Sequence, residues 1–128
     1  MTYGYCRIST KKQNIERQER NINASYPEAH IRKEVYTGTK SYRKEWNKLL
    51  KALKPADTVV FDSVSRMSRN AEEGFETYER LYNAGINLVF LKEPHINTDT
   101  YKQAIENQLQ IAINSGDNAT DELMQSIV

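Results

Sequence analysis

The sequence contains few of the residues from which small domains build cross-links or metal centres. One cysteine, Cys6, occurs in 128 residues, which excludes an internal disulfide and a cysteine-rich metal cluster. The two histidines, His30 and His95, lie far apart in sequence with no cysteine nearby, which argues against a zinc site. No 18 apolar residues run together and no signal peptide is visible, so we expect a cytoplasmic protein without a membrane span.

Charge is unevenly distributed along the chain. Residues 1–70 contain 15 Lys or Arg and 7 Asp or Glu, a net charge of +8, whereas residues 71–128 contain 3 and 10, a net charge of −7. The small overall charge of +1 therefore conceals a basic first half and an acidic second half. This asymmetry is consistent either with an anionic partner on one side or with ordinary variation of surface charge.

Strand and helix patterns alternate along the chain. Apolar runs predict strands over residues 3–8, 31–36, 58–61 and 86–91, and helical periods follow each of them. Three polar residues mark helix starts, namely Thr10, Ser41 and Asn70, and a last helical period covers residues 101–112 before "NSGDN" interrupts it. The pattern predicts an α/β fold with a mostly parallel sheet of four to five strands flanked by helices.

Arginines gather where two of these strands end. The first strand delivers Arg7 and Ser9, which share one face because side chains alternate along a strand. The third strand runs into "DSVSRMSRN", which supplies Arg66 and Arg69. Since ligands of such sheets bind beyond the carboxyl ends of the strands, neighbouring strands would place three arginines around one hydroxyl. Guanidinium groups match phosphate oxygens and stabilise a phosphoryl transition state without a metal, with the serine as nucleophile.

Less specific readings of these residues exist. An Arg-x-Ser pattern alone usually marks a helix cap and a salt bridge. A cysteine phosphatase also combines arginine with a covalent phospho-intermediate, but it needs an arginine six residues after its cysteine, and Lys12 occupies that place after Cys6. No histidine lies close to Ser9 in sequence, so a Ser-His-Asp hydrolase is not supported.

The stretches "YGYCRISTKKQ" and "DSVSRMSRN" together resemble the catalytic domain of the serine recombinases, the resolvase and invertase family. Members begin with a strand that reads aromatic-x-Arg-(Ile/Val)-Ser-Thr, and they carry an Arg-x-x-Arg pair after a later strand. An arginine also begins the intervening helix, and Arg43 in "YRKEW" matches it. Residues 1–100 follow this order and spacing, so the resemblance implies a resolvase-like catalytic domain over that range.

The resemblance implies a role for each matched residue. Ser9 matches the nucleophile that attacks a DNA phosphodiester and becomes joined to the 5′ phosphate, leaving a free 3′ hydroxyl. Arg66 and Arg69 match the pair that grips the phosphate and helps to protonate the leaving oxygen. Arg7 and Arg43 match further arginines of the active site.

Supporting glutamines of the family match Gln13 and Gln18. Strand exchange would then follow by rotation within a tetramer built from dimers, with DNA as the partner. The phosphoserine bond stores the energy of the broken strand, so the resemblance implies no ATP, no metal and no other cofactor. The alternative is a non-catalytic, recombinase-like module that only dimerises or regulates.

Two features depart from the family pattern. Ser65 stands where an aspartate commonly precedes the first arginine of the pair, and the nearest acid is Asp62. Asp62 either orients the arginines or only caps the following turn. The family also continues through a long helix into a DNA-binding region, whereas nothing basic follows the interruption at "NSGDN". We therefore expect residues 101–128 to form a helical segment leading toward a C-terminal DNA-binding region absent from this sequence.

Overall fold

The computed structural model describes residues 1–8, 15–35, 43–68 and 70–115. Along the chain the elements are β1 (Thr2–Ile8), α1 (Ile15–Ser25), β2 (His30–Val35), α2 (Lys44–Ala52), β3 (Thr58–Phe61), α3 (Val64–Met67), α4 (Ala71–Asn83), β4 (Asn87–Phe90), the 3₁₀ helix η1 (Pro94–Ile96) and α5 (Thr98–Ser115). No helix among these residues is long and apolar enough to cross a membrane.

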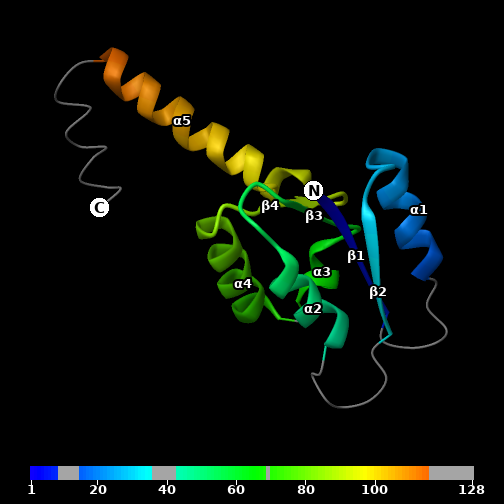
Figure 1. Cartoon of the computed structure of the whole chain (residues 1–128). Coiled ribbons are helices and arrows are strands. Elements are labelled where there is room, and N and C mark those ends of the chain that lie inside the picture. The colour runs from blue at the N-terminus through cyan, green and yellow to red at the C-terminus, as the bar shows by residue number, and fades with distance from the viewer. Residues whose placement is uncertain (9–14, 36–42, 69, 116–128) are drawn as a thin grey trace.

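Four strands form one sheet in the order β2-β1-β3-β4, and every neighbouring pair is parallel. The predicted α/β fold with a mostly parallel sheet is therefore confirmed. Parallel strands need crossover helices, and these cover both faces of the sheet (Figure 1). The carboxyl ends of β1 and β3 are neighbours, as the predicted arginine cluster requires.

Side-chain alternation along the strands builds two cores. On one face, aromatic and aliphatic residues of β1, β3 and β4 pack against α2 and α4, with Tyr5, Trp46, Phe61 and Phe90 at the centre. On the other face, Cys6 and Val60 pack against Ile22 of α1. Successive side chains of β1 thus point into different cores, and this alternation fixes the register of the strand.

α1 approaches the sheet closely because Gly4 lies beneath it. A Cβ atom on Gly4 would lie 2.6 Å from Ile31 Cδ1 and 3.0 Å from Ile22 Cγ2. A larger residue would therefore require the end of the Ile31 side chain to move and would press on Ile22 of α1.

Helix starts and ends test the capping predictions. Asn70 begins α4 as expected, since its Oδ1 accepts a hydrogen bond from Glu73 N at 2.8 Å. Gly85 follows the same helix with a φ of 82°, a conformation that suits glycine. The helix starts predicted at Thr10 and Ser41 lie outside the described residues.

The last helix differs from its prediction at both ends. α5 begins at Thr98 rather than at residue 101, because the buried Thr98 Oγ1 accepts a hydrogen bond from Leu88 N at 2.9 Å and ties the helix start to β4. It continues to Ser115, past the start of the predicted break at "NSGDN". α5 extends away from the body of the domain (Figure 1).

Candidate active site

Arg7 lies where β1 loses its neighbour β3. The pairing of these strands ends at Tyr5 and Phe61, and beyond it the side chain of Gln18 from α1 takes the place of a strand. Gln18 Oε1 accepts from Arg7 N at 3.0 Å, and Gln18 Nε2 donates to Arg7 O at 2.9 Å. Both residues are buried, so Gln18 satisfies main-chain groups that would otherwise be costly to bury.

Arg66 is brought to the same place by α3. Its Nη1 donates to Arg7 O at 3.2 Å, while Arg7 Nη2 donates to Ser65 O at 2.5 Å. Each arginine thus donates to the main chain of the segment that carries the other, which places Arg7 and Arg66 side by side. Convergence of three arginines around Ser9 stays a prediction, because Ser9 and Arg69 lie outside the described residues. Within the described part of the chain, Arg66 Nε is buried and has no hydrogen-bond partner.

Arg43 immediately precedes α2 and contacts the main chain of α3. Its Nη1 donates to Met67 O at 2.6 Å, and its Nη2 donates to Arg66 O at 3.2 Å. The guanidinium carbon also lies 4.8 Å from the centre of the Trp46 ring and 5.2 Å from that of Tyr5. Arg43 is buried, and in this arrangement its donors hold the carbonyl end of α3 and do not point outward.

A buried polar network that sequence reasoning missed lies behind Arg43. Arg43 Nε donates to the Tyr5 hydroxyl at 3.3 Å, and that hydroxyl donates to Glu34 Oε1 at 3.0 Å. The Glu34 carboxylate also accepts from the main-chain nitrogens of Glu45 and Trp46 at 2.9 and 3.2 Å, so it caps α2. Burial raises the pKa of Tyr5 far above its ordinary value, and the phenol stays protonated as a donor.

Among the described residues, Asp62 contacts neither an arginine side chain nor the start of α3. It is 2% exposed, and its carboxylate accepts from Asn21 Nδ2 at 2.9 Å and lies 3.3 Å from Lys92 Nζ. No arginine of the described residues contacts it, and it precedes α3 without capping it. The sequence could not show this, because Asn21 and Lys92 come from other elements.

Glu93, which the sequence analysis overlooked, caps α3 instead. Its carboxylate accepts from Val64 N at 2.9 and 3.3 Å. Ser65, at the departure from the family pattern, is exposed and pairs its hydroxyl with that of Ser63 at 2.8 Å. The side chain of Ser65 therefore does not replace the missing carboxylate.

Three predicted site residues, Ser9, Gln13 and Arg69, lie outside the described residues. Cys6, the other candidate nucleophile, is fully buried, and burial raises the pKa of its thiol to about 12. A thiol in that state is neutral and shielded at physiological pH. Among the described residues, no group of three His, Cys, Asp or Glu side chains is placed to hold a metal ion.

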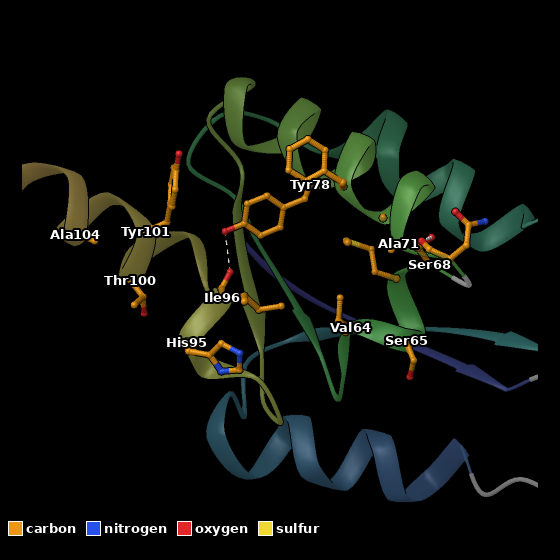
Figure 2. Close-up of a pocket in the computed structure, with 14 residues that line it drawn as sticks. Val64, Ser65, Ser68, Ala71, Tyr78, His95, Ile96, Thr100, Tyr101 and Ala104 are labelled. Carbon is orange, nitrogen blue, oxygen red and sulfur yellow. Dashed lines mark hydrogen bonds between the residues drawn. The ribbon is translucent and has the colours of Figure 1, made fainter. Parts of the chain in front are cut away.

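An apolar groove of about 740 Å³ lies beside the arginines. Val64 and Ser65 of α3 form one end, Tyr78 of α4 lines one wall, and Tyr101 of α5 lies at the far end (Figure 2). Phe75 of α4 also lines the groove. The Tyr78 hydroxyl donates to Ile96 O at 2.7 Å and closes the wall between α4 and η1. The groove and the arginine pair thus share α3.

The chain matches known families over most of its length. The family model described as the resolvase N-terminal domain matches residues 2–118. A resolvase of Clostridium perfringens is 28% identical over 99 residues, which cover 77% of this chain and 52% of the relative. The transposon Tn552 resolvase of Staphylococcus aureus is 32% identical over 93 residues, covering 73% of this chain and 47% of the relative. The chain therefore spans about half the length of the curated relatives it matches.

Solved structures share the fold. A resolvase family site-specific recombinase from Streptococcus pneumoniae superposes with a TM-score of 0.57 at 21% identity, covering 98% of this chain and 94% of that one. A serine recombinase from Sulfolobus solfataricus gives a TM-score of 0.58 at 17% identity, with 98% and 94% covered. At these identities the likeness concerns the fold alone.

Proposed function

Because this chain belongs to the resolvase family, through the N-terminal domain that the family model covers, we propose that it is the catalytic domain of a serine site-specific DNA recombinase. Residues 1–100 would carry the chemistry, and residues 101–128 would lead toward a DNA-binding region. Its substrate would be a DNA phosphodiester at a recombination site.

The proposed reaction is a transfer of a phosphoryl ester. The Ser9 hydroxyl oxygen attacks phosphorus and loses its proton, a serine–phosphorus bond forms, and the bond from phosphorus to the 3′ oxygen breaks. The 3′ oxygen takes up a proton and leaves as a hydroxyl, and the 5′ phosphate stays on Ser9. Rejoining is the reverse attack by a 3′ hydroxyl of the partner strand, so the number of phosphoester bonds is unchanged and no external energy source is consumed.

The observation that carries this proposal is the mutual link between Arg7 and Arg66 at the carboxyl ends of β1 and β3. Positive charge fixed at this place stabilises the charge that develops on phosphate oxygens in the transition state. Arg69, two residues beyond α3, would complete the pair.

Strand exchange requires several copies, and we propose that this chain acts in a dimer that assembles into a tetramer. The exposed apolar side chains of α4 and α5 support self-association: Phe75 is 68% exposed, Tyr101 50% and Ile111 65%. A helix of 18 residues that extends away from its own domain gains little stability by itself and favours a partner. The apolar groove beside α3 would face that partner.

The test uses supercoiled plasmid DNA that carries the sequences flanking the gene. The full-length protein should form an adduct with DNA that survives boiling in detergent and disappears after protease treatment. Ser9→Ala should bind the same DNA and form no adduct, whereas Ser25→Ala, on the exposed end of α1, should match the wild type. An adduct with Ser9→Ala would refute the assignment of the nucleophile. A wild-type full-length protein that binds the DNA and associates with itself but never forms an adduct would favour the non-catalytic module.

The same assay tests the independence from metal ions. The arginines supply the positive charge that Mg²⁺ provides in many phosphoryl transfers. Adduct formation should therefore persist in excess EDTA. Complete loss of the adduct in EDTA, with recovery on adding Mg²⁺, would show that the arginines do not suffice.

A further inference from the structure

The helix that carries Arg66, α3, is too short to be stable without contacts from other elements. α3 has four residues, and the main-chain bonds that join it to its flanking residues run from Arg66 N to Ser63 O at 3.1 Å and from Ser68 N to Val64 O at 3.3 Å. Fixing the dihedral angles of one turn costs more than so few bonds return. The position of Arg66 therefore depends on side chains that reach α3 from other elements.

Three such side chains hold α3, and they divide between its ends. Arg7 donates to Ser65 O, and Arg43 donates to the carbonyls of Arg66 and Met67. These two arginines satisfy the carbonyl end. At the amino end, Ser63 occupies the capping position without a side-chain cap, and the Glu93 carboxylate accepts from Val64 N instead. Glu93 thus performs the task that the capping residue leaves undone.

The route from the sheet to Glu93 is short and well fixed. The ladder between β3 and β4 continues past both strands, with Leu91 N donating to Phe61 O at 3.0 Å and Lys92 N donating to Asp62 O at 3.1 Å. The Lys92 ammonium adds its contact with the buried Asp62 carboxylate. The residue after Lys92 is therefore presented to the start of α3 by paired main chain.

We propose that Glu93 is a positioning residue for Arg66. By capping Val64 N, Glu93 fixes the amino end of α3, and α3 then holds the Arg66 guanidinium against Arg7 O. The inference rests on the proposed function, since it assumes that Arg66 binds a phosphate-like anion. It assigns to this site a carboxylate that touches neither the anion nor the reacting atoms.

When Glu93 is replaced, the loss of its charge and the loss of its cap should change the affinity for the anion in opposite directions. Removal of a negative charge near an anion site should strengthen anion binding if charge alone matters. Removal of the cap should weaken anion binding if the cap sets the position of Arg66. Glu93→Gln separates the two effects, because its amide oxygen still accepts from Val64 N while the charge is gone.

The experiment measures inorganic sulfate binding through the Nε–H signals of the arginines in ¹⁵N NMR spectra. Wild type should show a saturable shift at Arg66. Glu93→Ala should weaken sulfate binding about fivefold, the effect of one net hydrogen bond, whereas Glu93→Gln should bind at least as well as wild type. Glu79→Ala, which removes an exposed carboxylate from α4, controls for net charge and should not weaken binding.

Val64→Pro provides a second and independent test. Proline lacks the N–H that Glu93 accepts and suits the first position of a helix, and the extended backbone of Ser63 tolerates a following proline. In the Val64→Pro background, Glu93→Ala should therefore have no further effect on sulfate binding. Equal weakening in both backgrounds, or stronger binding by Glu93→Ala in the wild-type background, would overturn the proposal. Absence of any sulfate shift at Arg66 in wild type would instead count against the proposed function.

Discussion

Gln18→Ala should destabilise the protein by about 3 kcal/mol. The substitution removes the acceptor of Arg7 N and one of the two donors to Arg7 O, both buried beneath α1. A buried N–H that loses its acceptor costs about 1–3 kcal/mol. Loss of the contacts of the Cγ methylene group adds about 0.8 kcal/mol. Arg7 O keeps the donor Arg66 Nη1, so the carbonyl contributes little to the loss.

The loss is measured by urea unfolding at pH 7. Wild type and variant are compared with the same dependence of the unfolding free energy on urea concentration. Gln103→Ala is the matched control, because Gln103 is exposed on α5 and should change the unfolding free energy by less than about 0.5 kcal/mol. A Gln18→Ala loss below about 1 kcal/mol would refute the reasoning. It would mean that the end of β1 does not depend on the Gln18 amide as a substitute for a strand.

Gln18→Glu extends the same argument to a dependence on pH. Ionised, the introduced carboxylate still accepts from Arg7 N but faces Arg7 O with a second acceptor, and burial also disfavours its charge. Its pKa in the folded state is therefore raised above the unfolded value of about 4.3. A raised pKa means that stability is fully present below that value and is lost as the pH rises toward the folded pKa. The deficit against wild type should thus be smaller at pH 4 than at pH 7, and an equal deficit at both would contradict the geometry.

Three further predictions concern other buried or paired charges. Arg43→Lys should lower the unfolding free energy by about 2–3 kcal/mol in urea, since an ammonium group cannot reach three separate acceptors. Asp62→Asn should cost about 1–2 kcal/mol in a thermal melt, because the amide loses the charge that faces Lys92. Hydrogen bonding from Lys54 N, together with the N-terminal ammonium, lowers the pKa of Asp57. Stability from Asp57 should therefore be present above its unfolded pKa of about 3.9 and fall as the pH drops further, a dependence that Asp57→Asn should remove in urea midpoints at pH 2–5.

The fold could be predicted because the pattern that indicates each strand or helix lies within a few consecutive residues. The apolar run at residues 58–61 is buried on both faces, as β3 is, and Asn70 with Glu73 marks the start of α4 correctly. The boundaries that were missed depend on distant contacts. α5 begins early because Thr98 bonds to β4, and no pattern near Thr98 shows this.

Some contacts of the site could be predicted from local motifs, and others could not. The meeting of Arg7 and Arg66 follows from the order of two motifs at the ends of neighbouring parallel strands. The partners of Asp62, by contrast, lie 41 residues away at Asn21 and across the next strand at Lys92. A carboxylate in a sequence does not indicate which helix end or amide it will meet, so Glu93 and Asp62 could be assigned only from the structure.

If the site has the proposed function, its arginines contribute both to catalysis and to folding. Arg7 and Arg43 both donate to carbonyls of α3, so the groups expected to bind phosphate also build the segment that carries Arg66. Replacing either arginine would therefore lower activity even if it never touched DNA. The two contributions separate when activity is compared with stability across variants. When a residue acts only by holding α3, its replacement should lower activity in proportion to the number of hydrogen bonds to α3 that are lost. Glu93→Ala provides the reference for this proportion, because Glu93 caps α3 from the opposite end. If replacing an arginine lowers activity by more than this proportion, that arginine binds the phosphate itself.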